Sequence, residues 1–153
     1  MNTFTPFKVY NASAGSGKTF NLVKSYLKLL FKNENIFAFK HILAMTFTNK
    51  AVGEMKDRLL KTLDEFSKTN VLDGKNDMFN LICTELDLSP IQVHTKSKNL
   101  HKTIMHNYAA FDITTIDGFN HKLIRTFAYD LDLPVNFEVD LDTDSLLQKA
   151  VDN

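Results

Sequence analysis

The fold is decided by the stretch Ala12-Ser13-Ala14-Gly15-Ser16-Gly17-Lys18-Thr19. The residues before it, 7–11, are typical of a short strand, and the residues after it carry apolar side chains at helical spacing, which predicts a helix over 18–32. A loop of small residues between a strand and a helix is the context that a phosphate-binding loop requires. The stretch therefore predicts an anion site at the start of a helix.

Each residue type in this loop has a chemical reason to be there. Gly15 and Gly17 permit backbone conformations that point consecutive N–H groups inward, and the helix adds the positive end of its dipole. We expect the Lys18 ammonium to reach the β- and γ-phosphates of ATP, and the Thr19 hydroxyl to ligate Mg²⁺. The general pattern begins with glycine, whereas this chain has Ala12. Residues 12–19 are thus the predicted ATP site, with Lys18 and Thr19 in catalytic roles.

The remainder of the chain alternates between strand and helix patterns. An α/β fold follows, with a parallel sheet flanked by helices. We expect strands over 41–47 and 112–115, helices over 49–66, 78–86, 90–110 and 118–129, a loop over 69–77, an extended piece over 135–141 and a last helix capped by Thr143. The apolar stripe predicted for the helix over 90–110 consists of Leu100, Ile104, Tyr108 and Phe111.

Composition excludes several classes of protein. The 153 residues are 44% hydrophobic, which suffices for one core. No stretch approaches the roughly 18 apolar residues of a membrane-spanning helix, so we expect no membrane partner. Cys83 is the single cysteine, which excludes a disulfide framework. These features predict a soluble, cytoplasmic protein.

The net charge of zero conceals an asymmetry along the chain. Residues 130–153 contain seven acids and one base, and residues 1–129 therefore carry 17 bases against 11 acids. A basic body could bind a polyanion, although an ordinary solvated surface explains the same charges.

Three ordered blocks resemble a known family. The run from Asn11 to Phe20 resembles the first motif of UvrD-like superfamily 1 DNA helicases, and is nearest to the RecB/AddA-like helicase–nuclease branch. Residues 46–51, followed by 54–58, look like the family's motif Ia. Residues 113–119 resemble its motif Ib, with Asp117 and Gly118 in place of the usual His and Ser.

The resemblance implies a fold and a function. The fold would be a P-loop NTPase (RecA-like) domain, incomplete here, with its core at about 7–60 and 112–130 and a helical insert at about 78–111. The whole chain, 1–153, would be the N-terminal portion of a longer ATP-dependent helicase. Such an enzyme would translocate 3′–5′ on single-stranded DNA and unwind DNA ends in repair or recombination, together with a partner helicase–nuclease protein.

The resemblance also implies DNA contacts. Phe47 would stack on a base, while Thr48 and Asn49 would bond a phosphate. Thr115 and Asp117 would occupy the same edge at the next strand. Core packing is the alternative for Phe47, and helix capping is the alternative for Asp117.

Two other classes stay open at this point: a small P-loop kinase or another P-loop ATPase, and a non-catalytic DNA- or protein-binding remnant. We expect the isolated chain not to hydrolyse ATP at helicase rates. Its only arginines, Arg58 and Arg125, lie in motif-linked helices, and it has no credible acidic Mg²⁺ motif. His94, His101 and His106 lack the spacing of metal ligands and are predicted to form a solvated basic stripe.

Overall fold

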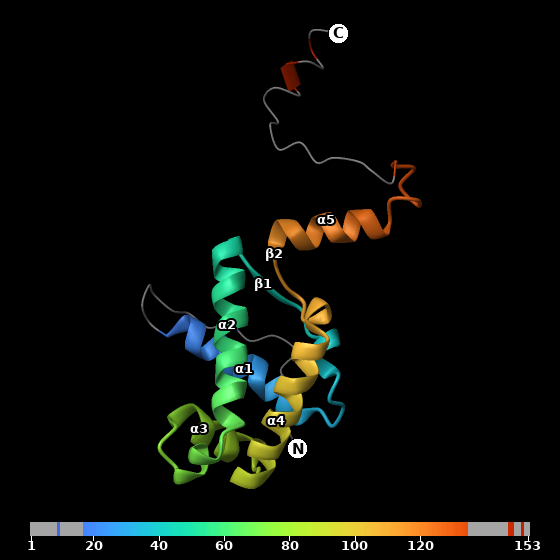
Figure 1. Ribbon diagram of the computed structural model, residues 1–153. Coiled ribbons are helices and arrows are strands. Elements are labelled where there is room, and N and C mark those ends of the chain that lie inside the picture. Colours follow the sequence, from blue (N-terminus) through green and yellow to red (C-terminus); the bar gives the residue numbers. More distant parts are fainter. Residues whose placement is uncertain (1–8, 10–16, 135–146, 149–150, 152–153) are drawn as a thin grey trace.

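The computed structural model describes residues 9, 17–134, 147–148 and 151, and this part of the chain is rich in helices (Figure 1). Apart from Val9, the predicted strand over 7–11 lies outside the described residues, as do loop residues 12–16, the extended piece over 135–141 and the cap Thr143. The elements, with η for a 3₁₀ helix, are α1 (Lys18–Lys32), η1 (Ala38–His41), β1 (Ala44–Thr46), α2 (Asn49–Phe66), η2 (Thr69–Asp73), α3 (Asp77–Leu86), α4 (Pro90–His106), η3 (Tyr108–Ala110), β2 (Ile113–Thr115) and α5 (Ile116–Thr126).

The sheet formed by the described residues is small. Strands β1 and β2 pair in parallel, with Ala44 opposite Ile113 and Thr46 opposite Thr115. Parallel strands need a long crossover connection, and here it runs through α2, α3 and α4. The predicted parallel sheet is therefore confirmed in part, as two strands of three residues each within a helix-rich chain.

The strand predicted over 41–47 is shorter than expected. Residues 38–41 form the 3₁₀ turn η1, and β1 begins only at Ala44. The turn places the Phe39 ring, which is fully buried, 6.5 Å from the ring of Phe111 in an edge contact. Packing of this aromatic side chain thus overrides the run of strand-forming residues.

Helix α4 ends earlier than the predicted Ala110. The Asn107 amide donates from Nδ2 to the carbonyl of Thr103, and its backbone N–H donates to Thr103 and Ile104. This cap closes the helix at His106, and η3 then turns Tyr108 outward while Phe111 enters the core. The assignment of Tyr108 to the apolar stripe was wrong.

The loop predicted over 69–77 was also only partly right. It contains the 3₁₀ turn η2, whose Val71 is buried, and α3 already begins at Asp77. By contrast, α1 has the bounds that the apolar spacing predicts. Helix α4 begins at Pro90 as predicted, with Ser89 as its N-cap.

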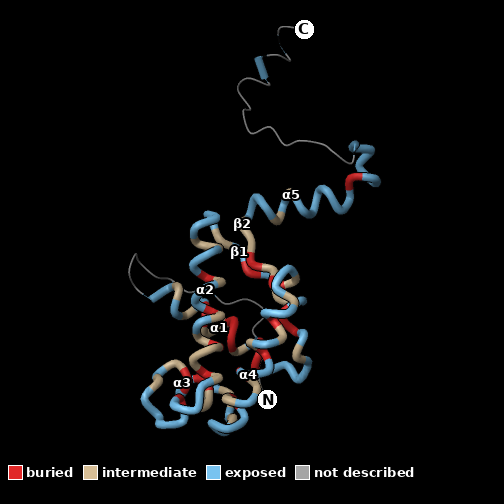
Figure 2. Tube along the Cα trace, viewed as in Figure 1, coloured by how far each residue is buried: buried red, intermediate tan, exposed pale blue. Residues whose placement is uncertain are grey.

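The core lies between α1, α2, α3 and α4 (Figure 2). Helix α2 contributes a stripe at helical spacing, and the Phe66 ring meets the Phe79 ring of α3 edge-on at 5.0 Å. Burial of such side chains stabilises a fold by about 1.5–3 kcal/mol each. The fully buried large side chains include Leu27 and Leu30 of α1, Met55, Leu59 and Leu63 of α2, Ile82 of α3, and Leu100 and Ile104 of α4.

Helix α5 differs from the other four. It has apolar residues on one side, yet none of its residues is buried, and Figure 1 shows it extending from the sheet away from the other helices. It begins at Ile116 rather than at Gly118, because the Thr115 hydroxyl caps it. The alternative that Asp117 caps this helix was therefore wrong.

Candidate functional site

The described end of the phosphate loop has the geometry of a loop-to-helix junction. Gly17 has φ +77° and stands at the N-cap of α1, and the first helical hydrogen bond runs from the Asn21 N–H to the Gly17 carbonyl at 3.0 Å. A side chain at this left-handed φ would strain the backbone, so the position favours glycine. Lys18 is exposed and Thr19 half-buried as α1 begins.

This helix start carries N–H groups that could bind an anion. The first N–H groups of any helix lack intrahelical partners. In α1 the N-cap is a glycine without a capping side chain, and the first turn contains no acid. An anion at this position would therefore gain several N–H donors and the positive end of the dipole, without an acidic side chain in the same turn of α1.

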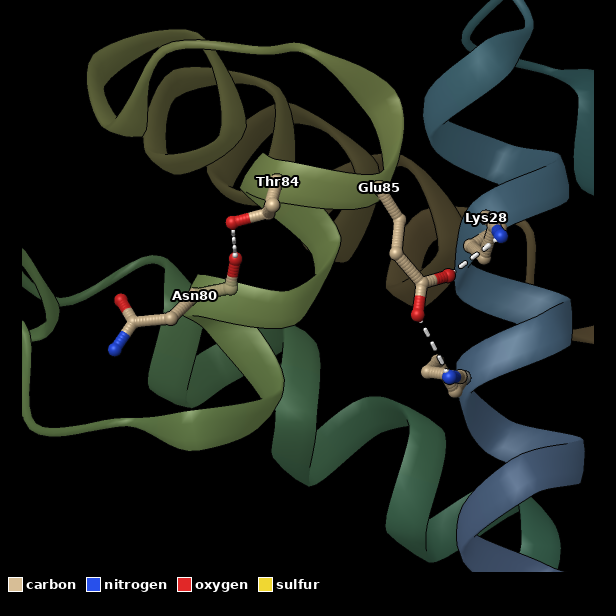
Figure 3. Close-up of polar contacts among 5 residues, drawn as sticks. Lys28, Asn80, Thr84 and Glu85 are labelled. Carbon is tan, nitrogen blue, oxygen red and sulfur yellow. Dashed lines mark hydrogen bonds and ion pairs between the residues drawn. The ribbon is translucent and has the colours of Figure 1, made fainter.

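Glu85 of α3 fixes the next turns of α1. Its two carboxylate oxygens accept from the ammonium groups of Lys24, at 2.8 Å, and Lys28, at 2.6 Å (Figure 3). These two hydrogen bonds lower the pKa of Glu85 to about 2. The residues lie 57 and 61 positions apart in the sequence, so no local pattern could have revealed this contact.

The second set of predicted residues lies where β1 and α2 meet. The Phe47 side chain is 86% exposed, which places it outside the core. The Thr48 hydroxyl accepts from the Ala51 N–H at 3.1 Å and so caps α2. A hydroxyl that accepts in this way keeps its own hydrogen, so Thr48 retains a donor for a phosphate oxygen. Asn49 follows as the exposed first residue of α2.

Strand β2 ends beside β1 with a matching arrangement. Thr115 is in register with Thr46, and its hydroxyl accepts from the Gly118 N–H at 3.0 Å to cap α5. A Cβ at Gly118 would lie 2.7 Å from Oγ1 of Thr114 and 3.0 Å from Oγ1 of Thr115, so the cap requires glycine there. Asp117 is exposed in the first turn of α5.

The structure therefore brings one predicted set together. Phe47, Thr48 and Asn49 lie at the end of one strand, and Thr115 and Asp117 at the end of its neighbour. The start of α1 lies elsewhere: Figure 1 shows it on the opposite side of α2 from the two strands. The sequence analysis did not predict the need for glycine at position 118. The available signal was Thr115, because a threonine at the end of a strand is a preferred N-cap for the helix that follows.

The histidines and the apolar stretches singled out in the sequence can also be placed in the structure. His94 is not part of a solvated stripe, because its Nδ1 lies 2.9 Å from the Phe66 carbonyl oxygen. Within the described residues, no group of His, Cys, Asp and Glu side chains could hold a metal ion. None of the described helices is long and apolar enough to cross a membrane.

Comparison with known proteins identifies relatives of this chain. The model of the UvrD/REP helicase N-terminal domain matches residues 3–153. An ATP-dependent helicase/nuclease subunit of Clostridium novyi (strain NT) is 32% identical over 92% of this chain and 9% of its own length. The "RecBCD enzyme subunit RecB" of Haemophilus influenzae is 31% identical over 89% of this chain and 12% of its own. The chain thus spans about a tenth of these relatives, and no solved structure matches it significantly.

Proposed function

Because this chain belongs to the UvrD/REP helicase N-terminal domain family, we propose that it is the ATP-binding segment of an ATP-dependent DNA helicase with a P-loop NTPase fold. Residues 12–19 would hold the phosphates of ATP, the Lys18 ammonium would neutralise the β- and γ-phosphates, and the Thr19 hydroxyl would ligate Mg²⁺. Hydrolysis of that ATP would drive translocation on single-stranded DNA and unwinding.

The start of α1 is the observation that carries this proposal. The left-handed Gly17 ends the loop, Lys18 and Thr19 follow it directly, and the first turn contains no acid. Negative charge at such a helix start is stabilised by the unsatisfied N–H groups as well as by the lysine.

Titration of Mg-ATP against the chain and two lysine variants tests the proposal. Lys18→Ala should weaken binding about tenfold or more, about 1.4 kcal/mol, because a charge-assisted contact is lost. Lys32→Ala removes the same charge from the exposed last turn of α1 and should leave affinity unchanged. Equal affinity of all three proteins would refute the ATP site.

DNA binding at the strand ends is the second part of the proposal. Phe47 offers a free ring face for a base, and the hydroxyls of Thr48 and Thr115 retain hydrogens that can bond phosphates. The start of α2, at Asn49, adds N–H groups without an acid in its first turn. Asp117 would contact a base or act through a bridging water, since a carboxylate repels a phosphate directly.

The isolated chain is proposed to bind ATP without rapid turnover. Helicase hydrolysis requires acids for Mg²⁺ and the attacking water, as well as an arginine at the γ-phosphate, which is worth about 10³–10⁵ in rate. A DNA-stimulated ATPase assay on residues 1–153 checks this expectation. Robust turnover that Lys18→Ala abolishes would mean that the chain holds its own catalytic acids.

The wider role rests on the relatives. A helicase of this family would act on DNA ends in repair or recombination, in the cytoplasm, with 3′–5′ polarity and with a helicase–nuclease protein as its partner. Polarity is determined by a strand-displacement assay with 3′- and 5′-tailed duplexes, on a protein of the relatives' length.

A further inference from the structure

A large groove runs along helix α4, on the side that faces the end of α1. Its volume is about 840 Å³, and its apolar lining comes from Phe31, Ile36, Leu88 and Ile91. Ile91 is 69% exposed, so this lining is open to a partner. On α4 the groove extends from Ile91 to Thr103, which corresponds to about 18 Å along the helix axis. A groove of this length and character suits an amphipathic helix of about three turns.

The two walls of this groove are joined by Lys96. Its ammonium donates to the carbonyl oxygen of Phe31 at 2.9 Å and to that of Asn33 at 2.6 Å, so α4 is fastened to the end of α1. A groove that is already formed costs little ordering when a partner binds. Lys102 lines the same groove, is exposed, and has no ion-pair partner among the described residues. The groove therefore offers a free positive charge near the end of α4.

Helix α5 has the shape and the side chains that such a groove would accept. It contains 11 residues, about 16 Å of helix, and none of them is buried. Ile116, Phe119 and Leu123 follow one another at spacings of three and four, which places them on one side of the helix. Asp117 is exposed in the first turn. Figure 1 shows α5 well apart from α4, so α5 does not fill the groove of its own chain.

We propose that α5 of a second copy of this chain binds in the groove along α4. The apolar side of α5 covers Ile36 and Ile91, and the two helices lie antiparallel, so that Asp117 at the start of α5 meets Lys102 near the end of α4. In this direction the positive end of each helix dipole lies near the negative end of the other. Because the groove and the helix are different surfaces, the contact is head-to-tail, and every complex keeps one free groove and one free helix.

Sedimentation velocity of the 153-residue chain over a range of concentrations tests the proposal. A single short helix in a groove is a small interface, so we expect self-association with a dissociation constant of about 10–100 μM. Ile91→Gln in the groove and Leu123→Gln on α5 should each weaken it about tenfold or more. Met105→Gln is the matched control, because Met105 is 53% exposed on α4 but does not line the groove, and it should leave the association unchanged. Urea denaturation verifies that all three variants are folded.

An equal mixture of the two defective variants provides the sharpest test. Ile91→Gln keeps an intact α5 and Leu123→Gln keeps an intact groove, so the mixture should associate with close to the wild-type affinity and stop at a one-to-one complex. A mixture that associates no better than either variant alone would overturn the proposal. So would a wild-type chain that stays monomeric throughout the concentration range, or self-association that Ile91→Gln and Met105→Gln change equally.

Discussion

Two regions of the molecule are built differently. One consists of the four packed helices α1 to α4, and the other consists of the strand ends and α5. Every helix from α1 to α4 buries at least two residues in the core, whereas α5 buries none. Even so, α5 carries an apolar side, with Ile116 45% and Leu123 45% exposed. Figure 2 shows the contrast directly, with the buried residues concentrated in the packed helices.

This difference predicts that the stability of the fold and the binding of ligands depend on different residues. Truncation inside the four helices removes packed atoms and leaves a cavity. Truncation at the strand ends or on α5 removes side chains that contact little within the described residues. Mutations in the first region should therefore change the free energy of unfolding, and mutations in the second should change binding.

The largest expected effect comes from the core. Leu59→Ala removes a fully buried side chain of α2 and should lower the free energy of unfolding by about 2–5 kcal/mol. Leu123→Ala on α5 is the matched control and should cost no more than about 0.5 kcal/mol. Urea denaturation of both variants measures the two values. A loss at Leu123 as large as at Leu59 would show that α5 packs as tightly as the other helices.

A smaller effect is expected at the contact between α3 and α1. Hydrogen bonds from Lys24 and Lys28 lower the folded-state pKa of Glu85 to about 2, so its contribution is present above the ordinary pKa of 4.5 and is lost as pH falls towards 2. Because the Glu85 side chain is 31% exposed, solvent screens the pairs, and we expect about 1 kcal/mol.

Glu85→Gln should therefore lower stability at pH 7 by that amount and flatten the acid limb of the stability profile. Thermal melts of both proteins between pH 7 and pH 2 test this. Parallel pH profiles for wild type and variant would contradict the assignment.

The smallest effect is expected at Tyr26, and it has the opposite sign. Its hydroxyl is buried without a hydrogen-bond partner among the described residues, and burial, together with the nearby Asp112 charge, raises its pKa. Tyr26→Phe keeps the edge contact with Phe111 and removes the unsatisfied group, so it should raise stability by about 0.5–1 kcal/mol. Destabilisation in a denaturant titration would mean that the hydroxyl has a partner in solution.

The sequence predicted the elements whose signals are local. The apolar spacing of α1 and the starts of α2 at Asn49 and of α4 at Pro90 each depend on signals within a few residues. The short strand β1 was overestimated because burial of Phe39 against Phe111, 72 positions away, favours a turn at 38–41.

The candidate site was predictable to a similar extent. Motif residues singled out Gly17, Phe47 and Thr115; the structure places Gly17 at the start of α1 and the other two at neighbouring strand ends, and their binding roles stay predictions. Sequence did not reveal the Glu85 contact, because it joins residues far apart in the chain. It also missed that Gly118 is required by the close approach of two threonine hydroxyls.

The most direct test of the separation between stability and binding is the single variant Phe47→Ala. Its affinity for a single-stranded oligonucleotide and its free energy of unfolding should be measured on the same preparation, with Phe37→Ala as an exposed control. We predict that DNA binding weakens by about 1–3 kcal/mol while stability changes by less than about 1 kcal/mol. A stability loss of about 3–5 kcal/mol with unchanged DNA affinity would place Phe47 in the core and contradict the account.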